Sequence, residues 1–259
     1  MRDNPVKTRL AAGQVVLGTM VFEFATPGLP ALLGASGAEF VLYDMEHSGF
    51  SIPDMKVQFG LCRGAGIIPL VRPPEKTYET VAQLLDCGAM GLMLQKVESA
   101  AEAAEIVSWT RYPTAGIRGA FFGGAHDDFT GGSLDEKMRL AEARTIVMPM
   151  IESCGGVANV DEIVATPGVD GVHLGQYDLS LSLGLPGQFD HPEIQGAIDA
   201  ILAACRRHGK FAACMAPSVE LAREWMGRGF TLISYGMDSG LLAGALSSGL
   251  SGIREGMAR

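Results

Sequence analysis

The stretch VLYDMEHSGF, residues 41–50, decides the fold that this sequence predicts. It begins as an apolar run typical of a strand with both faces buried, and it goes on to Asp44, Glu46 and His47. In a barrel of parallel strands, the side chains at the C-terminal ends of the strands surround one mouth, where such folds hold their active sites. Reactive side chains at the end of a buried strand therefore predict a parallel α/β fold with a functional site at that edge.

Two later stretches repeat this arrangement. IVMPMIES (146–153) places Glu152 after an apolar run, and GVDGVHLGQYDLS (168–180) places Asp178 after the next one. The two strands are consecutive, so we expect both carboxylates at the mouth, where a cation between them would relieve their repulsion. Two carboxylates with open positions suit Mg²⁺, Mn²⁺ or Co²⁺. Asp178 is equally compatible with an ordinary helix N-cap, so spacing alone leaves the metal pair open.

Strand-like and helix-like segments alternate along the whole chain. Eight such units in 259 residues predict a single (β/α)₈ TIM barrel over 1–259, with continuous apolar strands because helices cover them. A doubly wound open sheet is the competing fold, but no GxGxxG turn follows an early strand. The expected strands are 14–22, 39–46, 67–72, 90–97, 145–151, 170–175, 210–216 and 230–236.

Composition restricts the class of function. A net charge of −9 argues against nucleic-acid binding, which needs clustered lysine and arginine. No apolar run approaches the ~20 residues of a membrane span, so no membrane partner is expected. The five cysteines form no CxxC pair, and no signal peptide precedes the first strand. These features predict a cytoplasmic enzyme acting on small molecules.

Two segments interrupt the alternation. Residues 116–132, GIRGAFFGGAHDDFTGG, are too long for an ordinary connection. They are either a solvated insertion or a lid over the mouth, with glycines acting as hinges. The tail SGLLAGALSSGLSGIREG (239–256) is rich in small residues, which fits a helix packed between subunits as well as a frayed terminal helix.

His47 and Arg72 are the candidate reactive groups. His47 follows the second strand and Arg72 ends the third, in PLVRPP. Beside a keto acid, Arg72 would stabilise a developing enolate oxygen and His47 would transfer a proton. The alternatives are a structural histidine and a buried ion pair of Arg72 with Asp44 or Glu46.

Lys96 offers a different chemistry. It lies near the end of the fourth strand, where a desolvated lysine could form a Schiff base in place of a metal. The acidic neighbour Glu98 favours a solvated or salt-bridged lysine instead. The remaining histidines show no metal-binding spacing and receive no role: His126, His173, His191 and His208.

Several motifs in order resemble the HpcH/HpaI family of metal-dependent, class II pyruvate aldolases, which includes hydroxy-oxo-heptanedioate and 2-keto-3-deoxy sugar acid aldolases. The resemblance covers about 14–240. The motifs are GAEFVLYDMEHSGF, PLVRPP, LLDCGAMG, RYPTAGIRG, IESCGGVANVDEIVATPGVDGVHLGQYDLSLSLGLPG and HPEIQGAI. It implies a barrel whose last helix is exchanged between neighbours, and a hexamer.

The resemblance also implies roles for individual residues. Glu152 and Asp178 would hold the divalent metal, His47 would be the base, and Arg72 would stabilise the enolate. Asp86, in LLDCGAMG, would raise the basicity of the histidine. Because Asp86 lies near the C-terminal end of a helix, which points away from the mouth of its own barrel, we expect this pairing to cross a subunit interface. Backbone amides at Tyr177 and Asp178 would hold the substrate carboxylate.

The chain departs from the family pattern around the substrate. Met150 replaces a glutamine that contacts substrate and should face the same interior as Glu152, two residues later. Gly175-Gln176 stands where Gly-Pro is usual, and Gln95-Lys96 replaces an apolar strand end containing proline. The metal and the base are thus retained while the substrate-facing surface differs.

In the loop, Phe121 and Phe122 stand where smaller residues are usual. With Met150 they predict an aldehyde partner that depends little on an anion contact. Asp127 and Asp128 point the same way if the loop covers the site.

These features together predict an aldehyde-lyase that cleaves a 4-hydroxy-2-oxo acid to pyruvate and an aldehyde through an enolate held by the metal. The alternatives on the same scaffold are a CoA-thioester lyase, a decarboxylase or a related enolate reaction. From another class, a catalytically silent keto-acid binder would hold metal and pyruvate without exchanging methyl protons.

Overall fold

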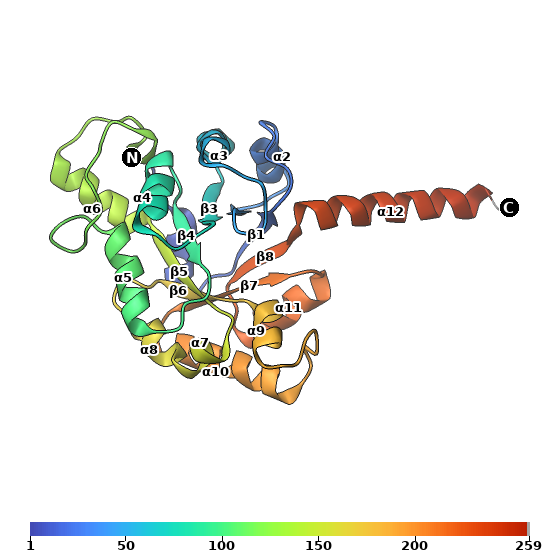
Figure 1. The fold of residues 1–259 in the computed structure, drawn as a ribbon. Coiled ribbons are helices and arrows are strands. Elements are labelled where there is room, and N and C mark those ends of the chain that lie inside the picture. The colour runs from blue at the N-terminus through green and yellow to red at the C-terminus, as the bar shows by residue number, and fades with distance from the viewer. Residues whose placement is uncertain (258–259) are drawn as a thin grey trace.

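Eight parallel strands close into a barrel, in chain order from β1 to β8, in the computed structural model, which describes residues 1–257 (Figure 1). The predicted (β/α)₈ barrel is confirmed. Every observed strand lies inside its predicted range, except that β8 ends one residue later. The strands are β1 (Val16–Val21), β2 (Phe40–Asp44), β3 (Ile68–Arg72), β4 (Gly91–Leu94), β5 (Ile146–Ile151), β6 (Gly171–Leu174), β7 (Phe211–Ala216) and β8 (Leu232–Met237).

Helices with well-defined ends surround the strands. α4, for example, begins after Thr77, whose hydroxyl accepts from the Thr80 N–H, and ends at Gly88, whose φ of 110° few other residues adopt. The helices are α1 (Pro5–Ala11), α2 (Leu29–Ala35), α3 (Ile52–Ala65), α4 (Tyr78–Cys87), α5 (Ala100–Thr110), η1 (Ala125–Asp127), α6 (Leu134–Arg144), α7 (Cys154–Ala158), α8 (Val160–Ala165), α9 (Gln176–Ser182), α10 (Pro192–His208), α11 (Val219–Arg228) and α12 (Asp238–Met257).

The barrel interior is filled by layers of side chains from alternate strands, as in other barrels of this class. At the N-terminal ends of the strands, Val6 and Leu10 of α1 pack into the same apolar cluster as the first residues of the strands, so α1 closes that end. The register places Met20, Arg72, Met150 and Met215 in one layer near the mouth, and Leu42, Met93, His173 and Ser234 in the layer beneath it.

The long loop 116–132 lies at the end of the barrel that α1 closes. Asp128 joins Arg63, at the C-terminal end of α3, and Arg144, just before β5, at 3.1 and 3.5 Å. The terminal amine of Met1 donates to the hydroxyl of Thr130, and Figure 1 places the N-terminus beside this loop. Within one chain the loop is therefore opposite the mouth, so a lid role remains open only toward the mouth of another subunit.

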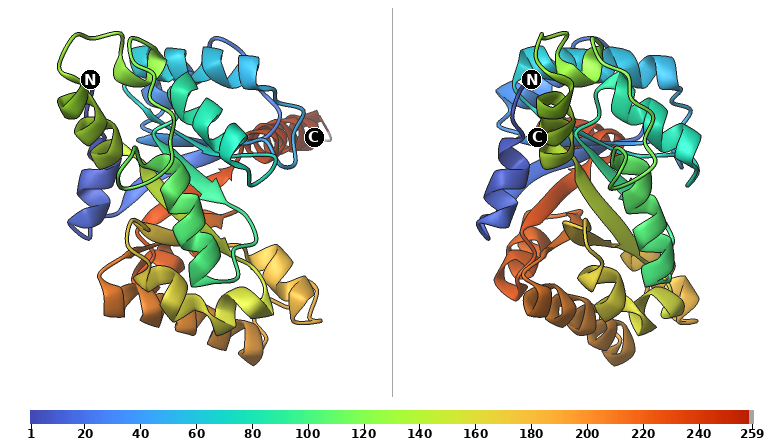
Figure 2. Two further views of the ribbon diagram at one scale, coloured as in Figure 1. Left: turned by 60° about the vertical axis from the view of Figure 1, so that its left-hand side comes forward. Right: turned by 90° about the vertical axis from the view of Figure 1, so that its left-hand side faces the viewer.

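Helix α12 extends away from the barrel instead of covering it (Figures 1 and 2). Asp238 anchors its start by accepting backbone N–H groups of Phe22, Glu23 and Phe24, and it is the one buried residue of this helix. The outer face of β1 and β8 is left as an apolar groove of about 580 Å³ between α2 and α11. Among the described residues, none of the helices has the length and hydropathy needed to cross a membrane.

Candidate functional site

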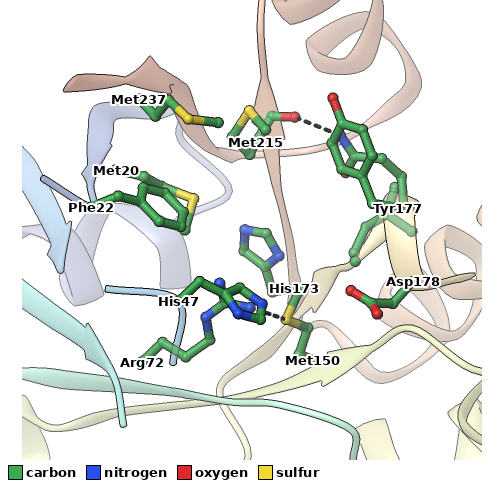
Figure 3. Close-up of a pocket in the computed structure, with 13 residues that line it drawn as sticks. Met20, Phe22, His47, Arg72, Met150, His173, Tyr177, Asp178, Met215 and Met237 are labelled. Atoms are coloured by element: carbon green, nitrogen blue, oxygen red, sulfur yellow. Dashed lines mark hydrogen bonds between the residues drawn. The ribbon is translucent and has the colours of Figure 1, made fainter. Parts of the chain in front are cut away.

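A cavity of about 240 Å³ opens at the C-terminal ends of the strands (Figure 3). It brings together five of the residues that the sequence singled out, from the segment after β2, from β3 and β5, and from the first turn of α9: His47, Arg72, Met150, Tyr177 and Asp178. The rest of its wall is mainly apolar and consists of Met20, Phe22, His173, Leu174, Gly175, Gln176, Met215 and Met237. The mouth predicted from the strand ends is therefore a real cavity.

Arg72 is held in place by two carboxylates. Its guanidinium forms a buried ion pair with Asp44, and another of its nitrogens lies 2.9 Å from Glu46. The sulfur of Met150 lies 3.8 Å from that same nitrogen. Sequence reasoning offered Asp44 or Glu46 as alternatives, and the structure uses both. Two neighbouring carboxylates keep the guanidinium fixed, with one nitrogen at the cavity wall.

Glu152 follows β5 directly and is only 3% exposed; it does not line the cavity itself but lies against Gly175 of the wall. Its Oε1 accepts the backbone N–H of Lys96 at 2.7 Å, and Lys96 adopts a left-handed φ of 50° there. Gly175 leaves the space for this carboxylate, because an added Cβ would come within 2.7 Å of its Oε2. Burial raises the pKa of Glu152 to about 7; the Lys96 N–H opposes this effect and the charge of Asp178 adds to it.

These two carboxylates fit a divalent cation. Asp178 lies in the first turn of α9, three residues after Gly175, and its charge acts on the buried Glu152. The attraction of a cation would offset both the repulsion and the desolvation that raise the pKa of Glu152. Within residues 1–257, no group of three or more acidic, histidine or cysteine side chains could hold a metal. The donor set is thus two oxygen ligands with open positions, which suits Mg²⁺ or Mn²⁺ better than a closed zinc site.

His47 is exposed at the edge of the cavity and does not meet Asp86 within the chain. Its Nε2 lies 3.8 Å from Glu46, and its backbone N–H donates to Asp44. Asp86 is paired instead with the buried Arg118 at 2.7 Å, where the loop 116–132 begins. Any His47–Asp86 pairing must therefore join two subunits.

The start of α9 forms another side of the cavity. The backbone N–H groups of Gln176, Tyr177 and Asp178 are in the first turn, which leaves them without acceptors in the helix. The ring of Tyr177 is half exposed and packs edge-on against Phe189, with 5.1 Å between ring centroids. These N–H groups are free to bind an anionic group at the mouth.

Lys96 contributes its backbone and not its amine. Its side chain is exposed and is absent from the cavity wall, while its carbonyl accepts from the amine of Lys76 at 2.7 Å. A Schiff-base lysine would have to reach the cavity from a desolvated position. The geometry does not support that alternative.

Sequence reasoning missed most of the apolar wall and assigned no role to His173. Met20, Met215 and Met237 come from β1, β7 and β8, which contribute methionines and no charged side chain to the cavity wall. His173 was left unassigned because it has no metal-binding spacing. The alternation of side chains along β6 could have indicated its position. Val172 and Leu174 pack outward against the helices, so Gly171 and His173 face the barrel interior.

Known proteins resemble the chain over nearly its whole length. A family profile described as HpcH/HpaI aldolase/citrate lyase matches residues 20–245. A 5-keto-4-deoxy-D-glucarate aldolase of Klebsiella pneumoniae is 34% identical over 242 residues, which are 93% of each chain. A 2-keto-3-deoxy-L-rhamnonate aldolase of Escherichia coli is 32% identical over 98% of this chain and 94% of its own. The crystal structure of an HpcH/HpaI aldolase from Desulfitobacterium hafniense superposes with a TM-score of 0.91 at 29% identity, covering 96% of both chains.

Proposed function

Because the chain belongs to the HpcH/HpaI aldolase/citrate lyase family, we propose that it is a metal-dependent lyase that cleaves a 4-hydroxy-2-oxo acid to pyruvate and an aldehyde. The proposal rests above all on the convergence of Arg72, His47 and Asp178 on one cavity, beside the buried Glu152. The two named relatives are aldolases of keto-deoxy sugar acids, which fits this reaction class.

Different residues of the site bind the metal and the substrate. Glu152 and Asp178 hold the divalent cation, Mg²⁺ or Mn²⁺, with Co²⁺ as a further candidate; when bound, it supplies a Lewis acid for the 2-oxo group. The first-turn N–H groups of Tyr177 and Asp178 bind the substrate carboxylate. These contacts orient the 2-oxo acid with its reacting carbons toward the cavity.

Bond cleavage then needs one proton transfer and one charge to be stabilised. His47 takes the proton of the 4-hydroxyl group while the C3–C4 bond breaks, releasing the aldehyde. The electron pair moves onto the 2-oxo oxygen, where Arg72 stabilises the negative charge. Return of a proton to C3 completes pyruvate. Because Asp44 and Glu46 already fix the guanidinium, Arg72 requires little reorganisation during this step.

We place the active site between subunits. Asp86 and the loop 116–132 meet through Arg118, at the end of the barrel away from its own mouth. If Asp86 of one subunit contacts His47 of another, the same docking brings the loop over that mouth as a lid.

The tail supports the same assembly. Leu242, Leu246, Leu250 and Ile253 share one face of α12 and are exposed, and the groove on β1 and β8 is open. Exchange of α12 between neighbours would cover both surfaces, consistent with a homo-oligomer such as a hexamer. The five unpaired cysteines fit a reducing compartment such as the cytoplasm.

The test is deuterium exchange at the methyl group of pyruvate, followed by NMR. We expect exchange with Mg²⁺ or Mn²⁺ and none with EDTA, because the first half of the reverse reaction removes a methyl proton. Glu152→Gln should reduce the rate by at least about 100-fold, whereas Glu105→Gln, an exposed carboxylate on α5, should not. Wild-type protein that shows no exchange with any of these metals would contradict the proposal.

A further inference from the structure

His173 is a buried histidine in the wall of the cavity whose hydrogen bonds the protein leaves unused. It is 2% exposed, and neither ring nitrogen has a hydrogen-bond partner within residues 1–257. In Figure 3 its ring stands between Met215 on one side and Arg72 and Met150 on the other. Buried polar groups in folded proteins are nearly always paired, so an unpaired one facing a cavity indicates a missing ligand.

The imidazole is neutral in this position. Burial, together with the nearby charge of Arg72, lowers the pKa of His173 to about 3. A neutral imidazole has one N–H donor and one lone pair. It can therefore bind a hydroxyl group in either direction, or donate to a carbonyl oxygen.

The methionine-lined side of the cavity next to His173 carries no charge. Met20, Phe22, Met215 and Met237 line the part of the cavity away from Asp178 (Figure 3). Arg72 is the permanent cation of the cavity wall within the described chain, and Asp44 and Glu46 already balance it. A carboxylate on this side would lose its hydration and gain no unpaired cation.

We propose that His173 is a specificity-determining residue that hydrogen-bonds to an uncharged hydroxyl group on the aldehyde part of the substrate. This inference rests on the proposed function, which places the 2-oxo acid at Glu152, Asp178 and Arg72 and leaves the methionine-lined side for the remainder. The methionines contact the apolar carbons of that part, because their flexible thioethers adapt to irregular shapes. The substrate class is thus a 4-hydroxy-2-oxo acid whose aldehyde half is uncharged and hydroxylated.

The experiment compares matched aldehydes in condensation with pyruvate and Mg²⁺. 2-Hydroxypropanal and propanal differ only in the hydroxyl group, and 4-oxobutanoate and butanal differ in the carboxylate. In the wild-type protein we expect kcat/KM to favour 2-hydroxypropanal over propanal by about tenfold, and butanal over 4-oxobutanoate. In His173→Phe, which keeps a flat ring without ring nitrogens, the first ratio should fall to about one.

Two further variants separate this role from a general effect on the barrel. Ser234 is buried in the same layer, its hydroxyl also has no partner in the described part of the chain, and it does not line the cavity. Ser234→Ala should therefore retain the wild-type ratio. His173→Asn supplies a donor and an acceptor and should retain part of the preference. If His173→Phe does not fold, the reduced preference of His173→Asn tests the role of His173 in its place.

The outcomes are distinguishable. A wild-type protein that treats 2-hydroxypropanal and propanal alike, or prefers 4-oxobutanoate to butanal, overturns the role of His173 while the methyl exchange of pyruvate still supports the aldolase. A hydroxyl preference that survives in His173→Phe likewise overturns the role of His173 and leaves the aldolase proposal intact. A wild-type protein without methyl exchange overturns the proposed function and this inference with it.

Discussion

The sulfur of Met150 lies 3.8 Å from a guanidinium nitrogen of Arg72. A residue on the inner face of β5 thus presents a thioether to the guanidinium that the proposed reaction uses. The thioether is at most a weak acceptor, so it leaves the hydrogen-bonding capacity of this nitrogen to Glu46 and to the substrate. Its main effect is to make this side of the cavity apolar.

Replacing that thioether by an amide should change which aldehydes react. In Met150→Gln, the amide N–H can donate to a carboxylate in the cavity, so we expect the ratio of kcat/KM for 4-oxobutanoate over butanal to rise about tenfold. Met150→Leu, which changes shape without adding a donor, is the control and should leave the ratio near its wild-type value. Equal ratios in the two variants would mean that the aldehyde does not reach this side chain.

Metal affinity should depend on pH through Glu152. Its pKa is raised to about 7, so it takes up a proton as the pH falls below that value, and a cation must then displace the proton. We expect the affinity for Mn²⁺, measured by electron paramagnetic resonance, to fall about 25-fold between pH 7.5 and pH 5.5. Glu152→Gln removes this titration, so its weaker binding should be nearly constant over the range. A wild-type affinity that is equally constant would separate Glu152 from the metal.

Subunit mixing tests the pairing of His47 with Asp86. His47→Ala and Asp86→Asn should each have little activity alone. When the two chains are dissociated and reassembled together, an intact His47 can face an intact Asp86 of a neighbour, and methyl exchange of pyruvate should recover to a sizeable fraction of the wild-type rate. Mixing His47→Ala with Arg72→Ala is the control, because both residues belong to the same mouth and no hybrid site is complete. Absence of recovery in the first mixture would contradict the shared site.

His173 should lower the stability of the protein in acid. Its pKa is about 3 in the folded state against an ordinary value of 6.5, so below pH 6.5 the unfolded chain binds a proton that the folded chain does not. Stability is therefore lost as the pH falls. Between pH 7 and pH 5, the free energy of unfolding should decrease by about 2 kcal/mol more in the wild type than in His173→Phe. Urea unfolding of both proteins at equal concentration measures this difference, and parallel curves would show that His173 titrates normally.

Removal of α12 should alter assembly without opening the barrel. A chain that ends after Gly240 keeps Asp238 and its backbone contacts but lacks the apolar face of the helix. We expect it to form a smaller oligomer by sedimentation, with unchanged strand content by circular dichroism. An oligomer of wild-type size would show that α12 is not part of the interface.

The strands could be predicted because each apolar run is bounded by turn residues and followed by a polar group. Glu152 and Asp178 could be predicted to lie close to one mouth, because consecutive parallel strands end at the same edge of the barrel. The position of the loop 116–132 could not be predicted, because it depends on ion pairs of Asp128 with Arg63 and Arg144, which are distant along the chain.

The role of His173 could not be recognised from sequence for a related reason. Sequence spacing identifies histidines that act in pairs on one helix or strand. His173 is notable for a different reason, which is its lack of hydrogen-bond partners in the described structure. Only the packed interior shows that its ring lines the cavity and that both nitrogens are buried with no partner among residues 1–257.

All eight strands precede α12 in the chain, and beyond its first turn α12 extends away from them. During synthesis α12 therefore leaves the ribosome only after every strand of the barrel, and barrel closure does not have to wait for it. Partner selection through α12 is thereby postponed until the barrel has been synthesised. A nascent chain can fold its barrel before the apolar face of α12 becomes exposed. This order shortens the time for which that face could bind unrelated chains.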